Sequence, residues 1–170
     1  MNFYRCVVKG SDIMVFEGQN DFVPDSYDRK ILDELSTNGR INVTELARRV
    51  GLSKTPVQAR LKKLEDSGII RGYRALLDPV RLGLDHVAFV EVRLTDTREK
   101  ALSAFNDAVL AVPEIEECHM LAANFDYLLK VRVRNMRDYR RVLAENLSSL
   151  PYVANTSTYV AMQAVKDEGI

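Results

Sequence analysis

The sequence contains little of what a metal centre, a disulfide framework or a redox site requires. Its 170 residues include only two cysteines, Cys6 and Cys118, and two histidines, His86 and His119. Cys118 and His119 are adjacent, and adjacent side chains of a strand point to opposite faces, so they cannot share a metal ion. Two cysteines without a pairing motif are typical of a reduced cytosolic protein. We therefore expect no metal, no disulfide and no cofactor.

Long apolar segments are also absent. No stretch approaches the roughly eighteen apolar residues that a membrane helix needs, and no apolar run follows the N-terminal arginine as it would in a signal peptide. Neither a nucleophile–base pair nor a metal cluster stands out, so we do not expect an enzyme. The apolar fraction of 46% is ordinary for a folded protein, and the length permits one or two small domains. We expect a soluble, cytoplasmic protein without a membrane partner.

The net charge is zero, but the charges are unevenly distributed along the chain. Lys and Arg number 24, as do Asp and Glu. Residues 28–74 hold eleven of the basic residues and six of the acidic ones, which leaves 13 basic and 18 acidic residues elsewhere. A basic segment attracts nucleic-acid phosphates through counterion release. A solvated helical face alone would not require such segregation, so the pattern favours a nucleic-acid contact at one end of the chain.

Residues 40–72 are the most informative stretch, because they predict two helices joined by a tight turn. Asn42 lies three residues before Glu45, the spacing of a capping box. Gly51 stands where a helix would end in the left-handed conformation, and Ser53 can cap a second helix. A short helix, a turn of three to four residues and a second helix with a polar tip is the arrangement that enters a DNA major groove.

The second helix of this pair would expose a set of hydrogen-bond donors. Its polar tip, Lys54, Thr55 and Gln58, would reach base edges, and Gln can pair with adenine through two bonds. The alternative is that this polar tip is simply exposed to solvent and binds no DNA. A short strand at Ile69–Arg74 would form a wing after the helix. Phosphate contacts are expected from the basic residues Arg60, Lys62, Lys63, Arg71 and Arg74, although Arg60 can instead brace the helices.

Flanking segments complete the N-terminal half. A helix should begin near Asp25–Asp28, because acidic residues in a first turn complement the helix dipole, and Asn38–Gly39 should end it. Residues 1–24 are an arm or extension with no assigned function, in which Tyr4–Lys9 and Ile13–Phe16 can form a small hairpin. We expect a DNA-binding domain at residues 25–75 and a linker at 76–85.

From residue 86 the hydrophobic period changes from 3.6 to 2, which indicates strands. The expected order of elements is strand–helix–strand–strand–helix–strand over residues 86–164, the ferredoxin-like arrangement. The fold class is therefore α+β, with an N-terminal winged helix-turn-helix and a C-terminal ferredoxin-like βαββαβ domain. Such a sheet carries helices on one face, and the open face would present Val87, Phe89 and Leu128. An apolar sheet face predicts a partner, most simply a second copy of the chain.

With these residues in view, the chain resembles the Lrp/AsnC family of transcription regulators over about residues 25–165. Two stretches carry the resemblance: DRKILDELSTNGRINVTELARRVGLSKTPVQARLKKLEDSGIIRGYRALLDP (28–79) and DYLLKVRVRNMRDYRRVLAENLSSLPYVANTSTYVAMQAVK (126–166). The resemblance implies double-stranded DNA as partner, a homodimer formed through the sheet, and further assembly to octamers or helical arrays. Two regions, Cys118 to Arg134 and Thr156 to Lys166, are most similar to activators of proline catabolism, with branched-chain amino-acid regulators second.

The resemblance also implies an amino-acid effector, bound between dimers at the loop joining the second and third sheet strands. Family members usually read Gly-x-x-Asp-Tyr there, whereas this chain has Ala123 at the glycine position. The expected effector residues are Ala123, Asn124 and Asp126, with Thr156 and Thr158 of the final strand adding hydroxyls if that strand adjoins the loop. Asp126 can also serve only as a cap for backbone N–H groups. Proline is the first candidate effector.

Two alternatives remain open beside this interpretation. The chain can be a branched-chain amino-acid regulator, or a metabolite-binding oligomer without specific DNA binding, which would leave the basic helix pair unexplained. An RNA-binding sheet would require exposed aromatic residues on its strands, and Phe89 alone is not such a set.

Overall fold

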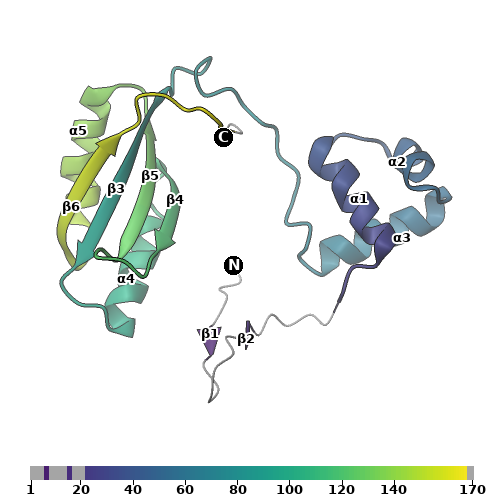
Figure 1. The fold of residues 1–170 in the computed structure, drawn as a ribbon, viewed down its shortest axis with the longest axis horizontal. Helices are drawn as coiled ribbons and strands as arrows, with labels where there is room; N and C mark the ends of the chain where they lie inside the picture. Colours follow the sequence, from purple (N-terminus) through teal and green to yellow (C-terminus); the bar gives the residue numbers. More distant parts are fainter. Residues whose placement is uncertain (1–5, 8–14, 17–21, 168–170) are drawn as a thin grey trace. The chain divides into compact units, whose positions relative to one another are not determined.

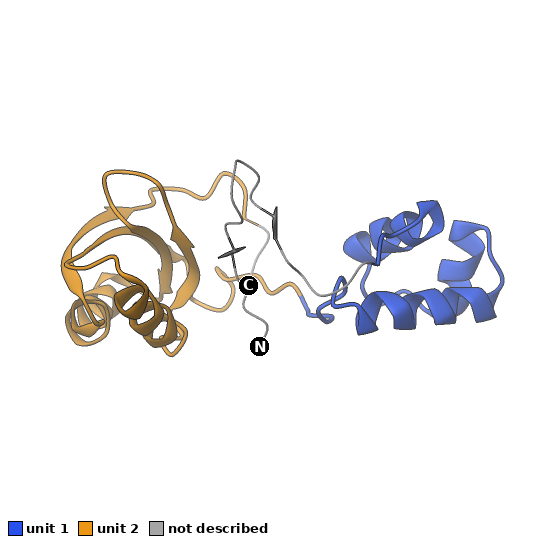
Figure 2. Cartoon of the chain, turned by 90° about the horizontal axis from the view of Figure 1, so that it is seen from below, with its two compact units in different colours: residues 1–75 blue, residues 76–170 orange. Residues whose placement is uncertain are grey.

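The structure is a computed structural model that describes residues 6–7, 15–16 and 22–167. The chain divides into two compact units, residues 1–75 and 76–170 (Figure 2). In the N-terminal arm, β1 (Cys6–Val7) pairs antiparallel with β2 (Val15–Phe16), as the hairpin interpretation predicts. The rest of the arm lies outside the described residues. Within the described part, no helix is long and apolar enough to cross a membrane.

The first unit begins with α1 (Ser26–Thr37), at the position that the sequence predicts. Asp25 is its N-cap and forms a capping box with Asp28. The Asp25 carboxylate accepts from the Asp28 N–H at 2.9 Å, and the Asp28 carboxylate accepts from the Asp25 N–H at 3.0 Å. Two N–H groups that a helix start leaves without partners are thereby satisfied. Asn38 ends the helix as expected.

Helices α2 (Val43–Val50) and α3 (Lys54–Asp66) form the predicted pair. Gly51 ends α2 at φ 75°, the left-handed conformation that favours glycine. Asn42 caps α2 by accepting from the Glu45 N–H at 2.9 Å, but the Glu45 carboxylate turns to Arg48 and Arg49. The three helices enclose one apolar core (Figure 1), whose fully or nearly fully buried side chains are Ile31, Leu46, Ala47, Val50, Val57 and Leu64.

The prediction of a strand at residues 69–74 is wrong, because residues 67–85 contain no strand. A strand needs a neighbour, and the described residues between 22 and 85 offer none. Gly68 and Gly72 have positive φ, which interrupts an extended run. Ile70 nevertheless donates to the Leu64 carbonyl at 3.1 Å, and the Tyr73 hydroxyl donates to Glu65 at 2.9 Å. The segment is thus fastened to the end of α3 as an irregular connection.

The second unit is the predicted βαββαβ arrangement around one antiparallel sheet (Figure 1). The strands lie in the order β4-β5-β3-β6. The helices are slightly shorter than predicted, and β6 ends before Met162. The bounds are β3 (His86–Leu94), α4 (Glu99–Val109), β4 (Ile115–Met120), β5 (Tyr127–Val133), α5 (Met136–Glu145), the 3₁₀ helix η1 (Leu147–Ser149) and β6 (Val153–Val160).

One face of this sheet packs on the helices and forms the core. Strand period places alternate residues of β3 and β5 on this face, and Val90, Val92, Leu129 and Val131 are completely buried. From α4, the Phe105 ring lies 4.5 Å from the Tyr127 ring, centroid to centroid. The alternation read from the sequence therefore identified the buried face.

The other face has no helix over it in the described part of the chain (Figure 2). Phe89 is 38% exposed on this face and lies opposite Lys130 of β5 and Tyr159 of β6. Leu128 is half-buried. Val87 was expected to be exposed here but is buried: Arg132 of β5 lies directly opposite it, and the C-terminal segment, residues 161–167, begins beside it with the Ala161 N–H donating to the Val87 carbonyl at 2.9 Å.

Candidate nucleic-acid interface and effector loop

The polar tip of α3 is the surface best placed to reach base edges. Lys54, Thr55 and Gln58 are all exposed, whereas Val57 on the opposite side of the same turn is completely buried. Ser53 is the N-cap, but its side chain makes no cap hydrogen bond. Because Val57 and Leu64 anchor the helix to the core, the tip is held in a fixed orientation within its unit. A protruding tip with amide, hydroxyl and ammonium donors is suited to a major groove.

Arg60 holds α3 to the start of α1, in a group that we call the Arg60 brace: Arg60, Asp25 and Asp28. The guanidinium Nη1 donates to Asp25 at 2.6 Å and to Asp28 at 2.7 Å. Asp28 is only 3% exposed, while the Arg60 side chain is 29% exposed. The pKa of Asp25 is lowered, first by the Asp28 N–H and then by Arg60. Of the two roles considered for Arg60, the structure shows the bracing one.

The other basic residues expected at phosphates are on the surface. Lys62 pairs with Asp66 at 3.0 Å, but both side chains are well exposed, so the pair is weak and easily exchanged for a phosphate. The Lys63 ammonium lies 4.1 Å from the centre of the Phe22 ring. Arg71 and Arg74 are exposed and make no ion pair with any described residue. These four side chains are available to a polyanion.

Sequence reasoning missed an ion-pair network on α2. The Glu45 carboxylate accepts from Arg48 and Arg49, and these bonds lower its pKa to about 2. Arg49 also donates to Glu34 of α1 at 2.9 Å, which ties the two helices together. The i, i+3 and i, i+4 spacing of Glu45 from the arginines was a readable signal. The Glu34 contact, fifteen residues away, was not.

The loop between β4 and β5 holds three of the expected effector residues. Ala123 and Asn124 are exposed, and the Asn124 carbonyl accepts from the Arg93 guanidinium of β3. Asp126 is engaged by β3: its Oδ2 accepts from the Leu94 N–H at 2.7 Å, and its own N–H donates to the Val92 carbonyl at 2.9 Å. Asp126 therefore has the capping role that was the alternative to ligand binding. Its Oδ1 accepts no hydrogen bond from the described residues.

Thr156 and Thr158 lie away from this loop within one chain. They belong to β6, which pairs only with β3 at the edge of the sheet, while the loop joins β4 and β5. They are opposite Val92 and Val90, so they share the helix-covered face. The Thr158 hydroxyl lies 2.6 Å from the Tyr139 hydroxyl of α5. The structure does not bring these threonines together with Asn124 and Asp126.

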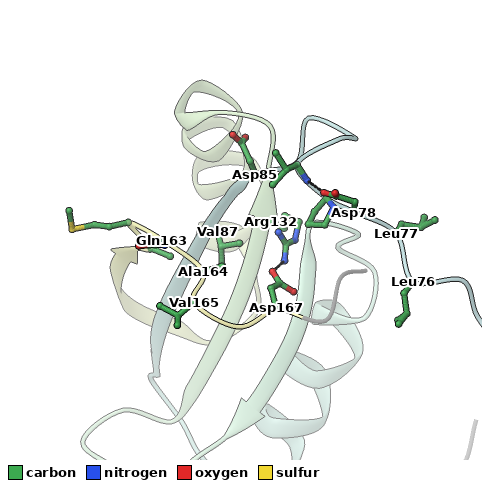
Figure 3. Close-up of a pocket in the computed structure, with 14 residues that line it drawn as sticks. Leu76, Leu77, Asp78, Asp85, Val87, Arg132, Gln163, Ala164, Val165 and Asp167 are labelled. Atoms are coloured by element: carbon green, nitrogen blue, oxygen red, sulfur yellow. Dashed lines mark hydrogen bonds and ion pairs between the residues drawn. The ribbon is translucent and has the colours of Figure 1, made fainter. Parts of the chain in front are cut away.

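A second group that the sequence did not reveal surrounds Arg132. Its side chain is 4% exposed although it belongs to the open face of the sheet. It donates to Glu116, to the Leu84 carbonyl at 3.2 Å and to Asp167 at 2.7 Å. The Arg132–Asp167 pair lies beside a cavity of about 700 Å³ (Figure 3). Its acidic partners lie 16 and 35 residues away in sequence, which explains why no local pattern disclosed them.

The cysteine and histidine residues that the structure describes are not gathered into a metal site. In the described ranges, no group of three or more His, Cys, Asp or Glu residues is placed to hold a metal ion. Burial raises the pKa of the Cys118 thiol to about 11, so the thiolate that reacts with electrophiles is scarce at neutral pH.

Comparison with known proteins matches both units to described domains. Residues 24–71 match a winged helix-turn-helix DNA-binding domain, and residues 87–170 match the Lrp/AsnC ligand binding domain. The chain is 62% identical to a proline dehydrogenase transcriptional activator of Rhizobium radiobacter, over 86% of this chain and 94% of that protein. It is 48% identical to the leucine-responsive regulatory protein of Escherichia coli K12, over 84% and 87%.

Solved structures give the same result at the level of the fold. A transcriptional regulator of Neisseria meningitidis in complex with L-Met has a TM-score of 0.78 and 35% sequence identity to this chain. The match covers 85% of this chain and 93% of that protein.

Proposed function

This chain belongs to the Lrp/AsnC family of transcription regulators, and we propose that it is a sequence-specific DNA-binding regulator of amino-acid metabolism rather than an enzyme. The exposed tip of α3, held by the Arg60 brace, carries this proposal. Lys54, Thr55 and Gln58 would read base edges, while the exposed Lys62, Lys63, Arg71 and Arg74 would contact phosphates. A regulator of this kind acts on the chromosome, so we assign it to the cytoplasm.

Proline is the effector that we favour, and proline catabolism the pathway. The relative named as an activator of proline dehydrogenase is 62% identical to the chain, against 48% for the leucine-responsive protein. Leucine or another branched-chain amino acid is the second candidate. The complex of the Neisseria regulator with L-Met supports an amino-acid ligand as the general class.

The proposed effector site is the loop at residues 121–126. An amino acid carries an ammonium and a carboxylate, so its site needs an anionic acceptor and N–H donors. The Asp126 Oδ1 can accept from the ammonium while its Oδ2 remains on Leu94. The N–H groups of the exposed Ala123 and Asn124 would serve the carboxylate. Thr156 and Thr158 share the helix-covered face of the sheet, and the Thr158 hydroxyl is hydrogen-bonded to Tyr139, so we leave both out of the proposed site.

Dimerisation through the open sheet face is the next part of the proposal. Phe89 and the half-buried Leu128 provide apolar area on a face that no described helix covers. A two-fold dimer would present two α3 tips to half-sites about one helical turn apart, or a multiple of it. We assign residues 25–75 to DNA binding, 76–85 to a linker and 86–164 to effector binding and assembly, with octamers as the larger assembly.

Mapping of chromosomal binding sites in the native host tests the regulatory role. We expect discrete sites upstream of genes for amino-acid breakdown, with proline dehydrogenase among them. Uniform, salt-sensitive coverage without discrete sites would contradict specific regulation and favour non-specific binding.

Calorimetry with each of the twenty amino acids, with sedimentation in parallel, tests the effector. Heat from proline together with a change in assembly is the expected result, because a ligand shifts assembly only by its difference in affinity between states. The Ala123→Gly variant should bind more tightly or more broadly, since glycine permits positive φ and a closer backbone approach. Absence of heat with all twenty would mean that this loop no longer senses amino acids.

A further inference from the structure

Four exposed arginines lie at the start and along the outer side of α5, one of the two helices that cover the sheet. None of them forms an ion pair or a hydrogen bond with any residue that the structure describes. They stand out because residues 76–170 as a whole are acidic, with eleven Lys or Arg against fourteen Asp or Glu. We call the following four residues the α5 arginines: Arg134, Arg137, Arg140 and Arg141.

The α5 arginines face away from the core of their unit. Tyr139 and Val142 are the buried side chains of α5 and belong to that core. At 3.6 residues per turn, Arg137 and Arg141 lie one turn apart on the opposite side of the helix. Helices α4 and α5 lie together on one face of the sheet (Figure 2), and Phe89 lies on the other. The α5 arginines would therefore stay accessible in a dimer formed through the open sheet face.

The charges of α5 are distributed against the helix dipole. Cations are favourable near the C-terminal end of a helix and anions near its N-terminal end. In α5, Arg137 lies in the first turn, the last turn contains no basic residue, and Glu145 ends the helix. Arg137 and Arg141 are also like charges at i and i+4, a spacing at which they destabilise a helix. The stability of α5 therefore does not explain where these arginines lie.

Helix α2 of the same chain shows the arrangement that folding alone favours. Glu45 lies in its first turn and two arginines in its last, and ion pairs join the three side chains. The α5 arginines lack such acidic neighbours, because the carboxylate of Asp138 accepts from the Asn135 amide instead. Unpaired cations at unfavourable helix positions indicate an anion from outside the chain.

The chemistry of the group indicates a row of phosphates as this anion. A guanidinium stays charged at all ordinary pH values and can bind phosphate through two parallel N–H bonds. Arg137 and Arg141 are about 6 Å apart along the helix axis, and one DNA strand presents about two phosphates over that length. The helix offers its side and not its tip, and the amide of Asn135 is engaged as the cap. Such a surface is suited to the DNA backbone and not to base edges.

We propose that the α5 arginines form a second, sequence-independent DNA contact, which binds phosphates of the duplex outside the stretch that α3 reads. This inference rests on the proposed DNA binding by α3 and assigns part of the same duplex to the second unit. Once α3 holds a site, the flanking DNA is tethered to the chain, so a weak phosphate contact acts at a high effective concentration. The acidic remainder of the unit repels DNA, which confines the contact to α5.

Binding of the full chain to two duplexes at several salt concentrations tests this contact. One duplex carries only the site that the unchanged chain selects, and the other extends that site on both sides by several helical turns. The variant combines Arg137→Gln with Arg141→Gln. The matched control combines Arg81→Gln with Arg98→Gln, which removes two exposed charges from the same unit, both already paired with aspartates.

We expect the variant to bind the long duplex about ten-fold or more weakly at low salt, and the short duplex as the unchanged chain does. The slope of log affinity against log salt on the long duplex should flatten by about 2 per bound chain, because each phosphate contact contributes about 0.9. The control should leave both affinities unchanged. Equal slopes for variant and control on the long duplex would overturn the α5 contact, and equal weakening on both duplexes would contradict its place outside the selected site.

The same measurements separate this inference from the proposed function on which it rests. If the unchanged chain does not discriminate the selected duplex from a scrambled one, sequence reading by α3 fails, whereas the salt slopes on long DNA still test the α5 arginines. Hydroxyl-radical footprinting of the long duplex should show backbone protection beyond the selected site, and the variant should lose only that part. Protection confined to the selected site with the unchanged chain would overturn the proposal.

Thermal unfolding distinguishes the binding role from a structural one. The variant should melt at the same temperature as the unchanged chain or higher, because Arg137→Gln removes a cation from the first turn of α5. A lower melting temperature would show that the α5 arginines stabilise the fold and would contradict the reasoning that assigns them to DNA.

Discussion

Removal of the Arg60 brace should destabilise the helix-turn-helix unit without disturbing the sheet unit. The Arg60→Met substitution keeps most of the aliphatic stem but removes the guanidinium that donates to Asp25 at 2.6 Å and to Asp28 at 2.7 Å. Asp28 is buried and would be left with an uncompensated charge. Loss of one partner from a buried ion pair costs about 3–5 kcal/mol. Because Arg60 is 29% exposed, water can replace part of the lost solvation, so we expect about 2–3 kcal/mol.

Native-state hydrogen exchange is the suitable assay, since it reports the opening free energy of each unit separately. The amides of Ile31 and Leu64 are buried in the first unit, and that of Leu129 is buried in the second. The matched control is Lys62→Met, whose pair with Asp66 is well exposed and should cost less than about 1 kcal/mol.

A double variant separates lost contact from unpaired charge. Asp28→Asn retains an acceptor for the Asp25 N–H and removes the charge that Arg60 neutralises. Adding it to Arg60→Met should therefore recover a large part of the loss, which appears as a coupling energy. If the opening free energy of the first unit were the same in Arg60→Met as in Lys62→Met, the Arg60 brace would not stabilise the unit. Arg60 would then again be a candidate phosphate contact.

Three further outcomes follow from the described geometry. Gly51→Ala should destabilise the first unit by about 1–2 kcal/mol, measured by urea unfolding, because the left-handed φ of 75° strains any other residue although no atom lies within 4 Å of the new Cβ. The pKa of Glu45 is lowered from 4.5 to about 2, so the ionised carboxylate adds to the free energy of unfolding above pH 4.5, and this stabilisation is lost as the pH falls toward 2. In the Glu45→Gln variant, the free energy of unfolding measured against pH should lack this acid-dependent part. Phe89→Asp should give smaller species in sedimentation and weaker operator binding, and an unchanged dimer would contradict the sheet interface.

The sequence predicted those features that depend on neighbouring residues. Asp25, Asn42 and Gly51 located the helix ends because caps are local chemistry, and the alternation in β3 located the buried face. Three features depended on distant partners and were not predictable. The strand predicted at 69–74 had no neighbouring strand to pair with. Val87 lies beside a segment more than seventy residues further along the chain, and the Thr158 hydroxyl is hydrogen-bonded to Tyr139.

The reading of DNA by α3 is the central claim, and its most direct test compares Gln58→Ala with Lys62→Ala. Both residues are exposed on the same helix, but only Gln58 lies at the tip. Affinity is measured at several salt concentrations for a duplex selected by the unchanged chain from a random pool, and for a scrambled duplex. Gln58→Ala should lose about 1–3 kcal/mol on the selected duplex alone, and Lys62→Ala should weaken both duplexes and flatten the salt dependence. Unchanged affinity of both variants for the selected duplex would show that another surface reads the DNA.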